Sequence, residues 1–287
     1  MTSFEWTGVN GVVWDLGAGP VSLAPGIMGL GLPGTDQYVR SSSALDGQRL
    51  TGSRTQPRRV FWPLAIRGAN AAEWLTTSRA FFAGLSADRT GTFKVTANDG
   101  QVRSIPLRLL SQDEQVFDAD PDLFAREVVG VDLVADDPFW RGPQVLQTFQ
   151  TAEDEQPFFN ATGTHVLNLM SSSTTASATV SNPGEVDAWP LWTLTGPASA
   201  FTIGVGSTVI SATMSLLVGE SVQVNTDPTV QVARKFVGGV STVLPFSAFT
   251  SIQFARVPSG ESVPLTVFIQ GAGSVSVQFD PGFRRAF

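Results

Sequence analysis

Residues 129–140 read VGVDLVADDPFW, a strong strand signal followed at once by the signal that ends it. Apolar side chains at every second position from 129 to 135 are typical of a strand with one buried face. The Asp-Pro step then ends the strand, because proline has no amide hydrogen to give to a sheet and forces the preceding residue into extended geometry. The stretch therefore predicts a junction between two β-rich halves of the chain.

Five residues form the candidate domain junction: Asp136, Asp137, Pro138, Phe139 and Trp140. Neighbouring carboxylates on a strand point to opposite faces, so the two aspartates are expected to end the strand rather than act as facing acid and base. Apolar bulk in a linker position usually plugs the end of a core. We therefore expect Phe139 and Trp140 to seal the first domain where the chain leaves it.

The length of 287 residues suits two domains, expected at residues 1–142 and 161–287 with a polar linker at 143–160. The chain has no cysteine, which excludes disulfides, thiolate zinc sites and cysteine nucleophiles. It has 28 glycines, 18 prolines and only 15% charged residues, a composition typical of turn-rich, mainly β proteins. The sequence shows no secretion signal and no apolar run of about 20 residues, so neither export by the standard route nor membrane insertion is expected.

Local patterns predict different architectures in the two halves. One helix is expected at about residues 70–86, where Asn70 is a plausible N-cap, Glu73 follows three residues later and an apolar stripe continues. The rest of the first domain is expected to be β, with a serine-, glycine- and arginine-rich loop at residues 41–57. In the second half, short strand candidates recur about every ten residues, which predicts a β-sandwich or jelly roll.

Arginines are concentrated in one segment of the first domain. The net charge of −7 argues against a general nucleic-acid binder. The planar guanidinium of arginine suits fixed ion pairs at protein interfaces, so these arginines could contact a partner. A solvated loop explains the concentration of arginines equally well. The candidate subunit or partner interface consists of Arg40, Arg49, Arg54, Arg58 and Arg59.

Motifs for catalysis and cofactor binding are incomplete. Residues 29–34 read GLGLPG, but no helix follows as a dinucleotide site requires, so close backbone packing in a turn is the better interpretation. Residues 118–122 read DADPD, but Leu123 and Val129 occupy the positions where a calcium loop needs glycine and glutamate. His165 is the single histidine. We expect no catalytic, metal or cofactor site and no enzyme, although a hydrolase whose carboxylates are brought together by folding stays open.

Two tryptophans of the second half are a candidate glycan or partner contact. Trp189 and Trp192 flank Pro190, and aromatic faces of this kind can stack on sugar rings. Packing in the core is the alternative, and residues three apart on a strand face opposite sides. At most one of the two is therefore expected to be buried. An alternative function is a carbohydrate-binding β-sandwich protein for host-surface adhesion.

Several stretches in a fixed order carry a family resemblance. They are LAPGIMGL at 23–30, DGQRLTG at 46–52, the strand at 60–67, the helix and the Asn98-Asp99-Gly100 hairpin, LVADDPFW at 133–140, NPG at 182–184, AWP at 188–190 and VGESV at 218–222. In this order they resemble the distal tail protein of long-tailed, non-contractile bacteriophages, a family also described as phage tail components or minor tail proteins.

The resemblance implies a fold, a location and partners. The fold would be an N-terminal β-barrel-like domain with one helix and a peripheral galectin-like sandwich. The protein would be a virion component of the tail tip, made in the bacterial cytoplasm. It would form a homo-hexameric ring joining the tail tube protein to the tail hub or baseplate, with a lumen for the tape measure protein and for DNA in transit. An acidic balance suits such a channel, because a lumen that bound phosphates would retard DNA.

Overall fold

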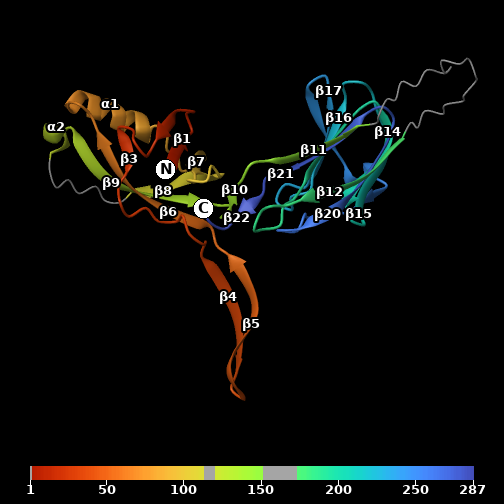
Figure 1. Cartoon of the computed structure of the whole chain (residues 1–287), viewed down its shortest axis with the longest axis horizontal. Coiled ribbons are helices and arrows are strands. Elements are labelled where there is room, and N and C mark those ends of the chain that lie inside the picture. The colour runs from red at the N-terminus through yellow and green to blue at the C-terminus, as the bar shows by residue number, and fades with distance from the viewer. Residues whose placement is uncertain (1, 113–119, 151–172) are drawn as a thin grey trace, which may run out of the picture. The chain divides into compact units, whose positions relative to one another are not determined.

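A computed structural model describes residues 2–112, 120–150 and 173–287 of the chain. The chain forms two compact units, and both are built mainly of antiparallel strands (Figure 1). Unit 1 consists of residues 1–143 and 282–287, and unit 2 of residues 144–281. The predicted mainly β fold class is confirmed. The structure differs from the predicted domain limits at the C-terminus, because the last six residues return to unit 1.

Unit 1 contains thirteen strands and helices among the described residues. They are β1 (Ser3–Thr7), β2 (Val13–Asp15), β3 (Val21–Leu23), β4 (Thr35–Ser42), β5 (Leu45–Thr55), β6 (Arg58–Arg67), α1 (Ala71–Phe82), β7 (Gly91–Thr96), β8 (Val102–Gln112), α2 (Pro121–Phe124), β9 (Arg126–Ala135), β10 (Trp140–Arg141) and β22 (Gly282–Phe283).

The main sheet of unit 1 is a nearly closed barrel. Its strand order is β2-β1-β7-β8-β9-β6-β3, and β10 joins it by pairing with β8 and β22. The two ends of this order approach each other, because the Leu23 amide donates to the Leu16 carbonyl at 2.8 Å. The predicted barrel-like first domain is therefore confirmed. Its interior is rich in aromatic rings, and Trp62 packs between Trp6 and Phe93 with centroid distances of 5.2 and 4.9 Å.

Helix α1 covers part of this barrel and is shorter than the predicted 70–86. The Asn70 side chain accepts a hydrogen bond from the Glu73 amide at 3.0 Å, as expected for an N-cap. Trp74 and Phe81 are the buried residues of the helix. The second helix, α2, was not predicted; Asp120, from the calcium-like stretch, caps it by accepting from the Asp122 amide.

The N-cap makes a testable contribution to the stability of unit 1. Replacing Asn70 by alanine leaves a first-turn amide without its acceptor and is expected to cost about 1 kcal/mol of unfolding free energy. Replacing Asn70 by serine keeps an oxygen at the cap and should restore most of it. Chemical denaturation of both variants measures the difference; equal stability of the two would contradict the role assigned to the cap.

The C-terminal residues Gly282–Phe287 belong to unit 1 and pack on it; we call this segment the C-terminal clasp. Strand β22 pairs with β10, placing Phe283 opposite Trp140. The guanidinium of Arg103 lies 3.9 Å from the Phe283 ring centroid, and the same side chain donates to the Arg285 carbonyl at 2.8 Å. Ala286 is buried in the core, and its amide donates to the Leu30 carbonyl at 2.9 Å. The chain thus closes unit 1 only after it has completed unit 2.

Unit 2 contains eleven described strands and one short 3-10 helix. They are β11 (Val145–Gln150), β12 (Ser173–Ser181), β13 (Leu191–Thr195), β14 (Ala198–Val205), β15 (Thr208–Leu216), β16 (Ser221–Asn225), β17 (Val232–Val237), β18 (Val240–Leu244), η1 (Phe246–Ala248), β19 (Ser251–Ile252), β20 (Ser262–Gln270) and β21 (Ser274–Phe279).

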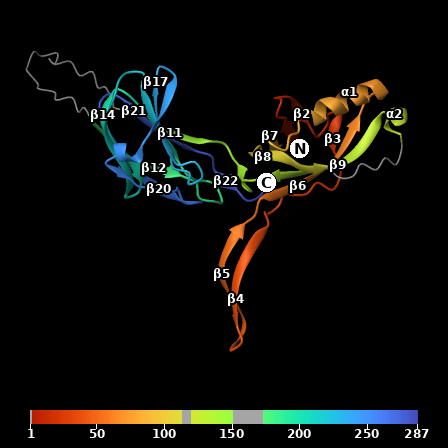
Figure 2. The ribbon, with the colours of Figure 1, turned by 180° about the vertical axis from the view of Figure 1, so that it is seen from behind.

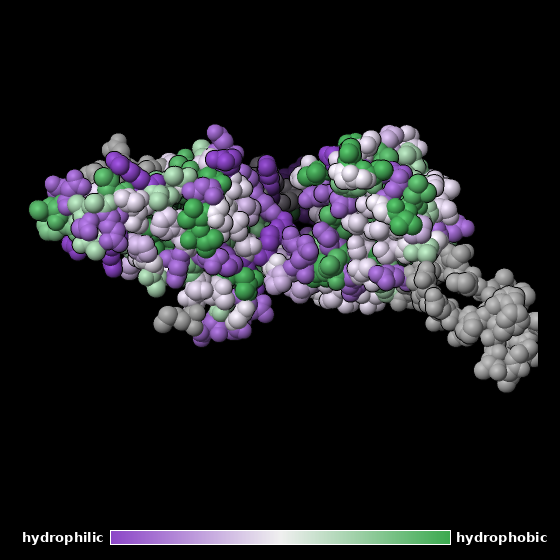
Figure 3. Space-filling model, turned by 90° about the horizontal axis from the view of Figure 1, so that it is seen from above, coloured by the Kyte–Doolittle hydropathy of each residue, from purple (hydrophilic) through white to green (hydrophobic). Residues whose placement is uncertain are grey.

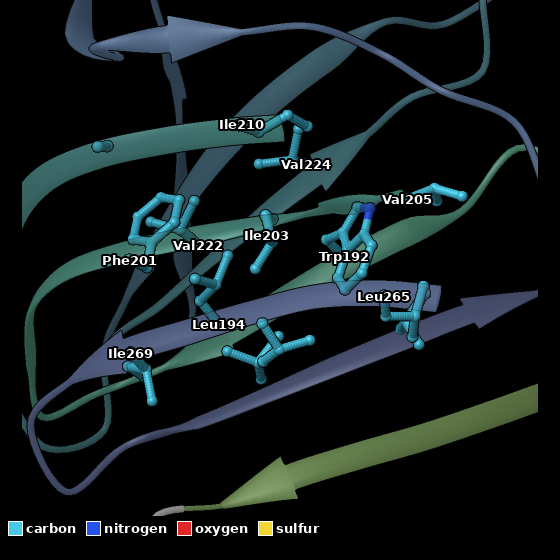
Figure 4. Close-up of a cluster of buried hydrophobic side chains, with 14 of the residues drawn as sticks. Trp192, Leu194, Phe201, Ile203, Val205, Ile210, Val222, Val224, Leu265 and Ile269 are labelled. Carbon is cyan, nitrogen blue, oxygen red and sulfur yellow. The ribbon is translucent and has the colours of Figure 1, made fainter. Parts of the chain in front are cut away.

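These strands form a two-sheet sandwich. One sheet has the order β11-β21-β13-β16-β17-β18 and the other β12-β20-β14-β15-β19. Side chains from both sheets, including Trp192, Leu194, Phe201 and Ile203, fill the space between them (Figure 4). The predicted sandwich is therefore confirmed, but part of the predicted linker, residues 145–150, is a sandwich strand paired with β21. His165 lies outside the described residues.

Candidate assembly surface

The arginine-rich segment is a projecting hairpin rather than the predicted loop. Strands β4 and β5 pair only with each other and extend away from the barrel in both ribbon views (Figures 1 and 2). Every residue of β4 is exposed. Its eight residues span about 26 Å at about 3.3 Å per residue. Alternating apolar residues could not signal this hairpin, because neither face of it is buried.

The two faces of the hairpin differ in chemistry. Asp36, Tyr38 and Arg40 alternate along β4 and share one face, on which Arg54 opposes Asp36 and Arg49 opposes Arg40. The three arginines predicted from this segment are therefore brought to one face. On the other face, Val39 opposes Leu50, and both side chains are exposed.

The hairpin is poorly stabilised by its own contacts. Two arginines directly opposed on neighbouring strands repel each other, as Arg40 and Arg49 do. A two-stranded hairpin without a packed face is marginally stable in water. An acceptor surface with carboxylates against the arginine face would relieve the repulsion, and an apolar surface against Val39 and Leu50 would supply a packed face.

Arg58 occupies a different environment from the other four candidate arginines. Only 2% of it is exposed, and its guanidinium donates to four carbonyl oxygens from three separate segments. The acceptors are Pro138 at 2.7 Å, Gly29 at 2.7 Å, Gly31 at 2.6 Å and Arg284 at 2.6 Å. Burial lowers the pKa of Arg58 to about 10, which leaves the group charged at neutral pH. Its guanidinium joins parts of unit 1 and is not accessible to a partner.

The glycine-rich motif at 29–34 supplies part of this arrangement. Gly29 has φ +92°, and a Cβ atom there would lie 2.4 Å from the Arg59 carbonyl oxygen. Only glycine allows the backbone to pass so close to β6 and still present its carbonyl to Arg58. Close backbone packing, the interpretation favoured from the sequence, agrees with this geometry.

Arg59 is exposed at the base of the hairpin and lines a small pocket of about 260 Å³. The same pocket is lined by Arg108 and Asp136, which form a two-pronged ion pair with both N–O distances at 2.9 Å. The hydrogen bonds from Arg108 lower the pKa of the Asp136 carboxyl. Asp136 is thus held in an ion pair at the end of β9.

This ion pair gives a pH-dependent signature. Because the folded-state pKa of Asp136 is lowered, the stabilisation is complete above the ordinary aspartate pKa of about 4 and is lost as the pH falls through the folded value. A carboxyl-carbon NMR titration should show Asp136 titrating below its ordinary range. Replacing Arg108 by alanine should return it to that range; an unchanged titration would contradict the pairing.

The rest of the candidate junction lies within unit 1. Asp137 pairs with Arg141, and the Pro138 carbonyl accepts from Arg58. Phe139 is half-buried, while Trp140 is fully buried in the aromatic core with its ring centroid 5.8 Å from that of Phe93. These positions hold the end of unit 1 together immediately before the chain passes to unit 2.

The two candidate tryptophans of unit 2 are in unlike environments. Trp192 is 1% exposed and packs in the sandwich core (Figure 4). Trp189 is half-buried and lines a surface pocket of about 460 Å³. Of the pair, Trp189 is therefore the one that a ligand can reach.

The described part of the chain has neither a cluster that could hold a metal ion nor a helix that could cross a membrane. Within residues 2–112, 120–150 and 173–287, no group of three or more histidine, cysteine, aspartate or glutamate side chains is arranged to hold a metal ion. In the same ranges no helix has the length and apolarity needed to cross a membrane. On the face shown in Figure 3, hydrophobic residues lie in small groups separated by hydrophilic ones.

The chain therefore has a two-unit, mainly β architecture: a barrel-like unit with a projecting hairpin whose two faces differ in chemistry, followed by a β-sandwich. Comparison with protein-family models finds no match, and comparison with curated protein sequences finds none either.

Solved structures do share this fold. The Dit protein (gp 19.1) of phage SPP1, described as a paradigm of the hub adsorption apparatus in phages that infect Gram-positive bacteria, has a TM-score of 0.66 and 14% identity. The similarity covers 99% of each chain. Two structures of the phage P2 baseplate in its activated conformation, with Ca and with Sr, each contain a chain with TM-score 0.58 and 11% identity, covering 97% of this chain and 98% of that one. The chain thus has the fold of phage Dit and baseplate proteins.

Proposed function

We propose that this chain is a structural protein of a phage tail tip and that it forms a homo-hexameric ring between the tail tube protein and the tail hub or baseplate. The ring leaves a central channel for the tape measure protein and for DNA in transit. The full-length fold similarity to the SPP1 hub protein and to phage P2 baseplate chains supports a tail-tip role. The tail-tip location in the virion, the six-fold symmetry and the named partners are parts of this proposal.

The single observation that carries the assembly proposal is the β4–β5 hairpin. It exposes an apolar pair, Val39 and Leu50, and an unfavourable arginine pair, Arg40 and Arg49, on opposite faces of an arm whose two strands pair only with each other among the described residues. The hairpin carries three arginines and two aspartates, a net charge of +1, on a chain of net charge −7. A carboxylate-rich surface on a second copy of this acidic chain would complement the hairpin.

Sedimentation velocity of the purified full chain tests the proposal. A hexamer of 30.5 kDa chains has a mass of about 183 kDa. Assembly follows mass action, so this species is expected to grow as the concentration rises from about 1 to about 100 µM. A single 30.5 kDa species throughout that range would contradict self-assembly into a ring.

A further inference from the structure

Unit 2 contains a pocket that the proposed tail-tip role does not use. Its volume is about 460 Å³, within the range of about 300 to 1,000 Å³ that small-molecule sites occupy. Trp189 lines it together with residues of the β14–β15 turn, of the segment 254–258 and of the start of β20. The pocket lies wholly inside unit 2.

The walls of the pocket are held by backbone hydrogen bonds. Ala188 and Val257 exchange two of them, at 3.0 and 2.8 Å, in an antiparallel bridge that brings the next residues, Trp189 and Arg256, opposite each other. The Gly206 amide donates to the Pro264 carbonyl at 2.8 Å, tying the β14–β15 turn to β20. The pocket is therefore formed before any ligand arrives, which lowers the entropic cost of binding.

The ion pair between Arg256 and Asp187 lies next to Trp189. The carboxylate of Asp187 accepts from the Ser259 amide and from Arg256 Nη1, both at 3.0 Å. The Arg256 side chain is 62% exposed, so its guanidinium is oriented by Asp187 and still presents N–H donors to solvent. Because Asp187 balances its charge, the pair offers directed hydrogen bonds without net charge.

We propose that this pocket binds a neutral pyranose. The apolar C–H face of a sugar ring matches the half-buried ring of Trp189, and neighbouring hydroxyls can accept from Arg256, which lines the pocket and has its charge balanced by Asp187. A purely apolar ligand would cover the Arg256 guanidinium without hydrogen-bonding to it, and an anionic one would have to compete with Asp187 for Arg256. This proposal goes beyond the tail-tip role and does not depend on ring assembly.

Saturation-transfer difference NMR on the full chain tests this directly. The probes are glucose, galactose, mannose, rhamnose, N-acetylglucosamine and N-acetylgalactosamine, with glucuronate as the anionic comparison, each at about 5 mM to detect affinities in the millimolar range. At least one neutral sugar is expected to show transfer, with little dependence on ionic strength because no net charge is involved. No transfer to any neutral sugar, or transfer to glucuronate alone, would overturn the proposal.

Three variants locate the binding. Trp189→Ala and Arg256→Ala are each expected to weaken it by about tenfold or more. Arg256 is largely exposed, so its variant tests the site even if Trp189→Ala is poorly folded. Arg234→Ala removes an equal charge from the exposed surface of β17, outside the pocket, and should bind as the parent does. Unchanged binding by Arg256→Ala would contradict the assigned site.

Discussion

Replacing Arg58 by alanine is expected to destabilise unit 1 by about 3 to 5 kcal/mol, because each buried carbonyl left without a donor costs about 1 to 3 kcal/mol and the costs are not fully additive. The substitution leaves the carbonyls of Gly29, Gly31, Pro138 and Arg284 without their shared donor. The cost is large because these carbonyls belong to the glycine-rich segment, the junction and the C-terminal clasp. Hydrogen-exchange mass spectrometry should show lost protection in all three.

The adjacent residue provides the matched control. Arg59 has the same side chain on the same strand but is exposed, so Arg59→Ala is expected to change stability by no more than about 0.5 kcal/mol. Unit 2 should exchange normally in both variants, because the four hydrogen-bond acceptors of Arg58 all belong to unit 1. Equal stability of the two variants would contradict the account of Arg58.

Removing the hairpin is expected to abolish ring formation while leaving the monomer folded. A variant in which Asn-Gly replaces residues 37–53 keeps the Asp36–Arg54 pair at the base and closes it with a two-residue turn. The barrel should survive, because the removed residues pair only with each other. Sedimentation velocity should then show the monomer alone, with an unchanged melting temperature.

Charge reversal separates the arginine face from the rest of the hairpin. Arg40→Glu combined with Arg49→Glu reverses the charge of that face and should weaken assembly at low salt more than at high salt. Arg89→Glu, an exposed position of unit 1 outside the hairpin, is the matched control and should assemble as the parent does. Assembly of the hairpin-deleted chain at parental concentrations would show that the ring is built by another surface.

Burial of one face made some strands predictable but not all of them: β11 packs Val145 and Phe149 on the sandwich core and was nevertheless predicted as linker. Strand β9 alternates buried and less buried residues, and this alternation marked the end of the first domain. The β4–β5 hairpin has no such alternation because both faces are exposed, so the same reasoning assigned a loop. Strand β18, exposed along most of its length, was missed for the same reason.

The residues of the candidate surface show a second limit. Sequence proximity placed Arg58 with the exposed arginines, yet its acceptors lie 27 to 226 residues away along the chain. No pattern of neighbouring residues can predict that carbonyls so far apart in the sequence meet around one side chain. The expectation for Trp189 and Trp192 assumed one strand carrying both, but β13 begins at Leu191 and leaves Trp189 before it. Their different burial therefore does not follow from alternation along one strand.

Electron microscopy of phage particles with a gold-labelled antibody to this chain tests the tail-tip proposal most directly. The account predicts label at the distal end of the tail, where the tube meets the hub, and none along the tube or on the head. Label along the tube or on the head, or particles that carry none of this chain, would contradict it.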